Sequence, residues 1–227
     1  MGGCGIEAKR QGLKGQCPNI AGARSPLPKT DMEEFFKRLK DLYGRMDAAY
    51  RAVADRYAFD CIGCDDNCCS QRFHHHTYIE EYYLVAGLKK SGPELKEQIG
   101  KRLRDYKAGG TAPPCPVNFE GLCSLHEWRP MICRLHGMPY VMRMPDGALV
   151  TGDGCGRFQG LHKPEIKLER TPFYAELARL EREFRQKSGI TAPYKKTTAE
   201  MLGGGTAPRD IGATSPPDIG GAKSPLS

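Results

Sequence analysis

Ten cysteines constrain this chain of 227 residues more than any other feature, because eight of them lie between positions 61 and 155. A cluster of this density indicates either a disulfide framework, which forms in an oxidising compartment, or thiolates that bind a metal in a reducing one. The opening residues, MGGCGIEAKR, contain no apolar stretch of the kind that directs secretion. We therefore expect a cytoplasmic protein, and we favour metal ligation over disulfides and over buried apolar thiols.

The first cysteine group is CIGCDDNCC, which has the spacing C-x2-C-x3-C-C. Cys61 and Cys64 are separated by two residues, and a tight turn over such a spacer directs two sulfurs at one ion. Cys68 and Cys69 are adjacent, so in extended backbone their side chains point to opposite sides. We expect these two to serve different sites, or one of them not to be a ligand.

The second group is spread over a stretch that shows no sustained periodicity. It comprises Cys115-Pro116, Gly121-Leu122-Cys123, Arg129-Pro130-Met131-Ile132-Cys133-Arg134 and Cys155. No second C-x2-C pair occurs, whereas a ribbon-type zinc site usually has two, and the closely spaced cysteine run of ferredoxins is also missing. The expected site is therefore assembled from separate loops, and an iron–sulfur cluster is favoured over zinc.

Taken in order, C-x2-C-x3-C-C, C-P, G-x-C and R-P-x2-C-R resemble the YkgJ-like cysteine-cluster family of zinc- or iron-chelating domains. The resemblance covers roughly residues 58–157 and implies a metal-chelating domain. The implied ligands are drawn from eight cysteines: Cys61, Cys64, Cys68, Cys69, Cys115, Cys123, Cys133 and Cys155. His126 and His136 depart from the family pattern, in which aromatic residues are common at these places, and they could add imidazole ligands.

Flagellin lysine methylases are relatives that carry a similar cluster as an iron–sulfur centre. The resemblance therefore implies an alternative function, an iron–sulfur-dependent enzyme of methyl-transfer or redox type, and a metal carrier or sensor is a third. Analogy within a family does not establish an activity. We identify no catalytic residue and no glycine-rich strand–turn–helix for a nucleotide cofactor. A zinc-protease motif is excluded, because Pro130 stands where HExxH requires its second histidine.

Other polar residues near the cysteines allow two interpretations each. Arg129 and Arg134 either donate hydrogen bonds to thiolate sulfurs, as groups around a metal site generally do, or lie on the surface. The run His74-His75-His76 is either a metal-loading patch or a solvated segment, and its composition favours the solvated segment. A metal ion or cluster is the expected binding partner, and no protein partner is predicted.

Four segments show helical periodicity, so we expect a mainly α fold. The first two begin at the capping-box pairs Thr30/Glu33 and Thr77/Glu80. Two β-like runs around the turn Pro145-Asp146-Gly147 predict one short hairpin. The expected architecture is a small helical domain around an irregular cysteine-rich centre. Its predicted helices cover residues 30–57, 77–91, 93–107 and 171–189.

The two ends of the chain, residues 1–29 and 190–227, repeat phrases rich in glycine, alanine, serine and proline. Their apolar content is too low to offset the ~1–2 kcal/mol per residue that backbone ordering costs. We therefore expect disordered tails on either side of one domain, residues 30–189. The net charge of +7 comes largely from the N-terminal tail, and the lack of a basic stripe with aromatic residues makes nucleic-acid binding unlikely as a function class. No segment approaches the ~20 apolar residues of a membrane span.

Overall fold

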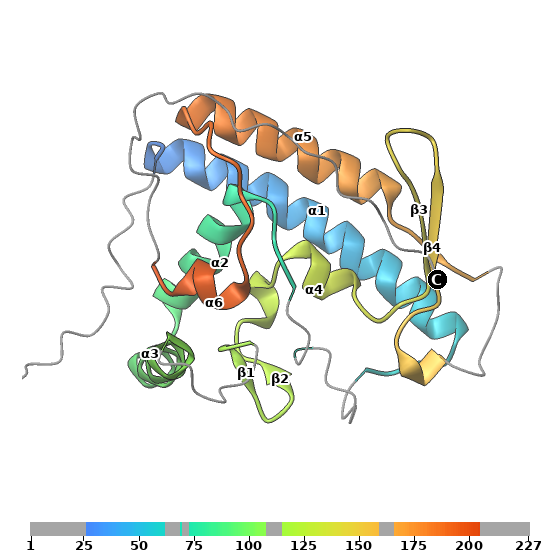
Figure 1. The fold of residues 1–227 in the computed structure, drawn as a ribbon, viewed down its shortest axis with the longest axis horizontal. Coiled ribbons are helices and arrows are strands. Elements are labelled where there is room, and N and C mark those ends of the chain that lie inside the picture. The colour runs from blue at the N-terminus through green and yellow to red at the C-terminus, as the bar shows by residue number, and fades with distance from the viewer. Residues whose placement is uncertain (1–25, 62–68, 70–72, 108–114, 159–165, 205–227) are drawn as a thin grey trace, which may run out of the picture.

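The computed structural model describes residues 26–61, 69, 73–107, 115–158 and 166–204, and this part of the chain is mainly helical, as expected (Figure 1). Residues 1–25 and 205–227 of the predicted tails lie outside the described residues. Within the described part no helix is both long enough and apolar enough to cross a membrane. The α-helices are α1 (Lys29–Arg56), α2 (Tyr78–Lys90), α3 (Pro93–Lys107), α4 (Met131–Leu135), α5 (Thr171–Ser188) and α6 (Thr198–Leu202).

Short strands and single-turn 3-10 helices link the helices. The strands are β1 (Asn118–Phe119), β2 (Leu122–Cys123), β3 (Tyr140–Arg143), β4 (Leu149–Gly152) and β5 (Leu168–Glu169). The 3-10 helices used below are η2 (His126–Trp128) and η3 (Gly156–Phe158).

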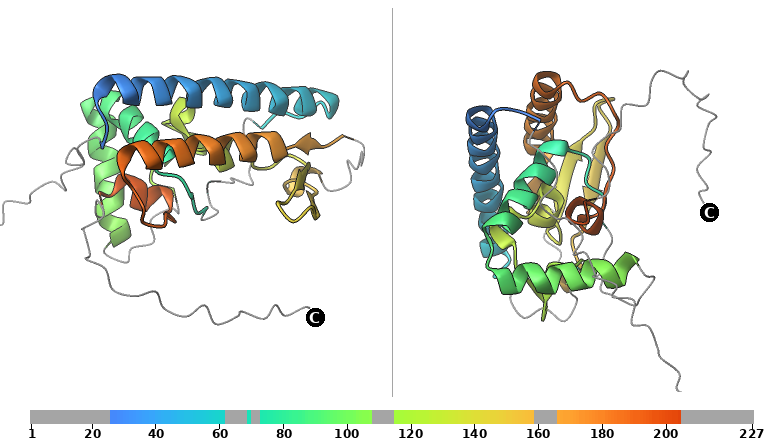
Figure 2. Two further views of the ribbon diagram at one scale, coloured as in Figure 1. Left: turned by 90° about the horizontal axis from the view of Figure 1, so that it is seen from above. Right: turned by 90° about the vertical axis from the view of Figure 1, so that its left-hand side faces the viewer.

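Helices α1 and α5 lie side by side and antiparallel along one side of the molecule (Figures 1 and 2). The apolar stripe predicted for the first helix is buried, with Leu39, Leu42 and Met46 completely enclosed. Phe35 of α1 meets Phe184 of α5 edge to face, with ring centroids 5.3 Å apart. Burial of such large apolar side chains is the main favourable contribution to folding. The two helices therefore form a rigid frame against which the shorter elements pack.

The two predicted capping boxes do not form at the start of α1 and α2, although both helices are confirmed. α1 begins one residue before Thr30 and has no side-chain cap. At α2, Thr77 is the N-cap, but the carboxylate of Glu181 in α5 accepts the backbone N–H groups of Tyr78 and Ile79 at 3.0 and 3.1 Å. Glu181 thereby satisfies two N–H groups that the first turn of a helix leaves without a partner in the helix itself. The cap of α2 is thus a contact between distant elements.

The predicted hairpin is confirmed as β3 and β4, whose register extends from Tyr140↔Gly152 to Arg143↔Leu149. Gly147 in the turn has a positive φ of 88°, a conformation that glycine adopts without a steric penalty. β5 adds to β3 in parallel and was not predicted. Its two residues are too few for a strand periodicity to be visible in the sequence.

The chain from 190 to 204 is ordered, so the predicted domain boundary at residue 189 is wrong. Tyr194 and Met201 are buried. Lys196 forms an antiparallel bridge with His75, through backbone hydrogen bonds of 2.7 and 3.0 Å. α6 has a complete capping box of its own. Burial of these apolar side chains offsets the entropy cost of ordering a segment whose composition alone suggested disorder.

Candidate metal centre

Two of the predicted ligands lie on β1 and β2 or next to them, and a tight turn brings them together. Cys115 precedes β1 and Cys123 ends β2. The turn between the strands contains Glu120 and Gly121, both with positive φ, at 52° and 82°. The side-chain Oδ1 of Asn118 accepts the N–H of Gly121 at 3.2 Å. The glycine of the G-x-C motif is therefore explained by the turn that returns β2 alongside β1.

A buried carboxylate that was not predicted as functional sets the position of α4. Glu80 of α2 accepts hydrogen bonds from the hydroxyl of Tyr43 at 2.8 Å, the hydroxyl of Thr77 at 2.6 Å and the backbone N–H of Met131 at 2.6 Å. Its side chain is 3% exposed. Met131 is the first residue of α4, the helix that carries Cys133. Glu80 therefore fixes the N-terminal end of α4 against α1 and α2.

Four sulfurs from distant segments lie within electrostatic reach of one another. Cys69 and Cys115 are hydrogen-bonded to each other. Cys69 also acts electrostatically on Cys123 and Cys133. The exposed Cys61 interacts with Cys69 in the same way. All five are reduced thiols, and each of them interacts electrostatically with at least one other member of the group.

The thiols of this group differ in their tendency to ionise. The hydrogen bond from Cys115 is the main cause, and the charge of Arg129 a lesser one, of a pKa of about 6 for Cys69. The same hydrogen bond, together with burial, raises the pKa of Cys115. Burial also raises the pKa values of Cys123 and Cys133. Near neutral pH Cys69 is therefore the thiolate of the hydrogen-bonded pair, whereas Cys115, Cys123 and Cys133 keep their protons.

The two arginines next to the cysteines have different roles. The charge of Arg129 contributes to the low pKa of Cys69, and it opposes the rise in pKa that burial causes in Cys123 and Cys133. Its Nε is buried and has no hydrogen-bond partner in the described part of the chain. Arg134 donates instead to Oδ2 of Asp47 at 2.6 Å, to the backbone carbonyl of Arg129 at 2.9 Å and to that of Glu127. Its side chain is only 4% exposed, so neither expectation for Arg134, a thiolate contact or a surface position, is found here.

Of the three other predicted ligands, Cys155 lies elsewhere, and the other two cannot be placed. Cys155 donates its backbone N–H to the carbonyl of Gly137 at 2.9 Å. It precedes η3, which Figure 1 shows near the end of α1 and away from β1 and β2. Cys64 and Cys68 lie outside the described residues. Among the residues that are described, no three His, Cys, Asp or Glu side chains form a group that could hold a metal ion.

The histidines lie in other environments. His126 is next to the groove described below, and burial is the main cause of its lowered pKa. His136 packs on Phe73, with ring centroids 4.6 Å apart. His75 is 2% exposed and is hydrogen-bonded to the hydroxyl of Thr198 at 3.1 Å. The interpretation of residues 74–76 as a solvated run is therefore wrong for the middle histidine.

A sequence signal for the role of Glu80 was present. Glu80 lies three, four and seven positions before Tyr83, Leu84 and Gly87, which are all buried, so it occupies the apolar face of α2. A carboxylate on such a face needs hydrogen-bond donors, because an unpaired buried charge is very costly. The capping-box prediction for Thr77 and Glu80 did not take this need for hydrogen-bond donors into account.

Comparison of the chain with protein-family profiles, with curated protein sequences and with solved structures gave no match.

Proposed function

We propose that this protein binds zinc or iron through thiolates, as an iron–sulfur cluster or as a single ion. The observation that carries the proposal is the electrostatic interaction among four thiols from separate segments: Cys69, Cys115, Cys123 and Cys133. Cys61 interacts electrostatically with Cys69, and Cys64 and Cys68 are the other candidate ligands. The ordered cysteine pattern, with its resemblance to the YkgJ-like family, supports the same assignment.

The donor set fits these metals chemically. Sulfur donors suit zinc and iron–sulfur clusters, whereas calcium and magnesium require oxygen ligands. The carboxylates in the hydrogen-bond network of α4 are already engaged, because Glu80 accepts three hydrogen bonds and Asp47 accepts one from Arg134. The thiols are therefore the groups that remain for ligation.

The electrostatics of the thiols also favour a cation. Burial keeps the protons on Cys123 and Cys133 as long as no positive charge is near enough to offset it. A bound metal supplies such a charge, and its binding releases protons from thiols that become ligands. The positive charge of Arg129 likewise lowers the pKa of Cys69. The buried Nε–H of Arg129 could donate a hydrogen bond to a thiolate at this place.

The described thiols do not form a complete metal group, so the proposal takes further ligands from the C-x2-C-x3-C-C motif. Cys64 and Cys68 are the candidates, since they belong to the same short segment as Cys61 and Cys69. A cytoplasmic location would keep all of these thiols reduced. An iron–sulfur enzyme of methyl-transfer or redox type, and a metal carrier or sensor, would use the same centre.

The metal content of cysteine variants tests the proposal. Cys69→Ser and Cys123→Ser each remove one sulfur at a partly buried position, and both are expected to lose most of the metal bound by the parent protein. Cys17→Ser is the matched control, because Cys17 lies outside the motif. Zinc, iron and sulfide are measured after anaerobic purification. Equal metal content in the parent and all three variants, or no metal in any of them, would contradict the proposal.

A further inference from the structure

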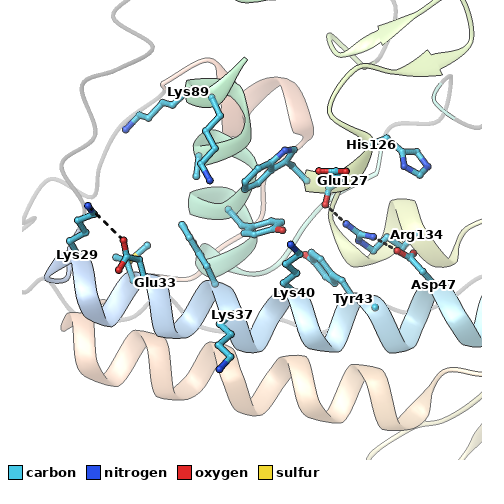
Figure 3. Close-up of a pocket in the computed structure, with 17 residues that line it drawn as sticks. Lys29, Glu33, Lys37, Lys40, Tyr43, Asp47, Lys89, His126, Glu127 and Arg134 are labelled. Atoms are coloured by element: carbon cyan, nitrogen blue, oxygen red, sulfur yellow. Dashed lines mark hydrogen bonds and ion pairs between the residues drawn. The ribbon is translucent and has the colours of Figure 1, made fainter. Parts of the chain in front are cut away.

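A groove that contains no described cysteine runs between α1 and α2 and ends at η2 (Figure 3). It has a volume of about 1190 Å³. Small-molecule pockets usually measure ~300–1,000 Å³, so the groove has room for a ligand the size of a cofactor. Asp47 and Arg134 stand at its end next to the cysteine group. The metal proposal does not use the rest of the groove.

Aromatic rings line the groove on both sides. Tyr83 of α2 packs against Trp128 of η2 with ring centroids 4.7 Å apart, and Phe36 of α1 meets Tyr83 at 5.3 Å. The indole lies directly on Gly87, where a Cβ atom would stand 2.2 Å from Cγ of Trp128. The absence of a side chain at Gly87 therefore lets the indole approach the backbone of α2. Tyr83 itself is buried, so Phe36 and Trp128, which are partly exposed, form the apolar wall on which a flat molecule can stack.

The rim of the groove carries a surplus of positive charge. Lys37 and Lys40 of α1 and Lys89 and Lys90 of α2 line it, and all four are exposed. No ion pair involves any of the four within the described part of the chain. Two of the three carboxylates in the lining are already engaged, Glu33 with Lys29 at 3.8 Å and Asp47 with Arg134 at 2.6 Å. The third carboxylate belongs to Glu127, and the four lysines outnumber this one negative charge.

Two of these lysines are close to the aromatic wall. The Nζ of Lys90 lies 5.0 Å from the ring centroid of Trp128. Figure 3 shows Lys40 extending from α1 beside Tyr43, whereas Lys37 points away from the rings. Lys40 and Lys90 therefore approach from opposite walls. A single compact ligand that joins a ring to a negative group can meet both charges and the rings at once.

Gly44 gives a ligand access to the backbone of α1. It lines the groove in the middle of the helix, and a Cβ atom built there would have no atom within 4 Å. Glycine inside a helix lowers the stability of that helix relative to alanine. No packing contact in the structure requires its small size, so the space above Gly44 is open to an occupant of the groove.

We propose that the groove between α1 and α2 binds a nucleotide-type ligand, with its ring stacked on the wall of Phe36 and Trp128 and its phosphates bound by Lys40 and Lys90. Lysine ammonium groups bind phosphate oxygens through charge-assisted hydrogen bonds, and aromatic side chains stack on nucleotide bases of any sequence. No glycine-rich loop is needed, because side chains supply both contacts. The site is independent of the metal proposal, since no described cysteine lines it.

Fluorescence of Trp128 provides the test, because it is the single tryptophan of the chain. The full-length protein is titrated with ADP as the probe, and adenosine and inorganic pyrophosphate are titrated separately. ADP is expected to change the emission saturably, with an affinity at least tenfold higher than that of either part alone. Pyrophosphate binding as tightly as ADP would overturn the proposal, since it would leave no role for the aromatic wall.

Two sets of variants locate the binding. Gly44→Leu fills the open space without changing charge, and its control is Ala52→Leu, an exposed position of α1 that does not line the groove. Lys40→Gln combined with Lys90→Gln removes two charges, and its control is Lys101→Gln combined with Arg104→Gln on α3. The groove variants are expected to weaken ADP binding at least tenfold, and the controls less than twofold. Circular dichroism verifies that each variant is folded.

Several outcomes would contradict the proposal. A lack of saturable emission change up to millimolar ADP would contradict it, as would equal ADP affinity in parent and Gly44→Leu protein. Saturable binding of poly-L-glutamate without binding of ADP would also overturn it, because the groove would then recognise an acidic protein segment.

Discussion

The backbone N–H of Met131 donates a hydrogen bond to the carboxylate of Glu80 at 2.6 Å, across 51 positions of sequence. This bond joins the first residue of α4 to the first turn of α2. The same carboxylate accepts the hydroxyls of Tyr43 and Thr77. The element that carries Cys133 is thus held by this polar contact as well as by its buried side chains Met131 and Leu135.

Replacing Glu80 by alanine is expected to destabilise the protein strongly. The change removes a charged acceptor from three donors and leaves those donors buried, and each unsatisfied buried group costs ~1–3 kcal/mol. We expect the free energy of unfolding, measured in urea, to fall by about 3 kcal/mol or more. Glu97→Ala, at an exposed position of α3, should change it by less than ~0.5 kcal/mol. A similar small effect for Glu80→Ala would show that the network does not hold α4.

The carboxyl of Glu181 should make stability depend on pH. Burial raises its pKa to about 7, even though the N–H groups of Tyr78 and Ile79 oppose the shift. The folded state then binds this proton more tightly than the unfolded state, so the contribution to stability is full below the unfolded pKa of 4.5 and is lost as pH rises to about 7. The loss is at most ~3 kcal/mol, at 1.36 kcal/mol per pKa unit.

Glu181→Gln tests this pH dependence, because the amide cannot ionise. The free energy of unfolding of the parent protein should decline relative to that of the variant between pH 5 and pH 7.5. The measurement is urea unfolding followed by circular dichroism at several pH values. Parallel pH profiles for the two proteins would contradict the assigned pKa.

Alanine substitutions at two helical glycines should have opposite effects. Gly87→Ala places a Cβ atom 2.2 Å from Cγ of Trp128, so the indole must move. We expect a loss of ~1–3 kcal/mol, typical of overpacking, together with a change in tryptophan emission. Gly44→Ala meets no atom within 4 Å and should stabilise α1 by ~0.5–1 kcal/mol. Thermal unfolding of both variants measures these changes in stability. Equal changes in the two variants would mean that the indole does not rest on Gly87.

Truncation tests where the domain ends. A chain that stops after Gly189 loses the buried Tyr194 and Met201, and burial of such side chains contributes ~1.5–3 kcal/mol each. Its free energy of unfolding should therefore fall by more than ~3 kcal/mol. A chain that stops after Gly204 should keep the stability of the parent within ~0.5 kcal/mol. The contradictory result is a chain ending at Gly189 that is as stable as the longer one.

The helices and the hairpin could be predicted because their signals are local. The stripe that includes Leu39 and Met46 repeats at helical spacing, and the turn at Gly147 lies between two β-like runs. The same local pattern was misleading at Thr77, because Glu181, 103 positions from Tyr78, supplies the cap. A contact between distant helices leaves no periodic trace in the sequence.

The candidate site was predicted less completely than the fold. Motif spacing singled out Cys69 and Cys115, which are hydrogen-bonded to each other in the structure. Spacing along the chain does not say where a later loop such as the one with Cys155 lies in space. The role of Arg134 was missed for a related reason, since its partner Asp47 is 87 positions away on α1.

The absorption spectrum of the anaerobically purified protein, together with its zinc, iron and sulfide content, tests the thiolate metal centre most directly. The account predicts bound metal in stoichiometric amount, with iron, sulfide and a broad visible band for the favoured cluster, or zinc without colour for a single ion. Protein that carries no metal while every cysteine reacts with a thiol reagent under native conditions would contradict it.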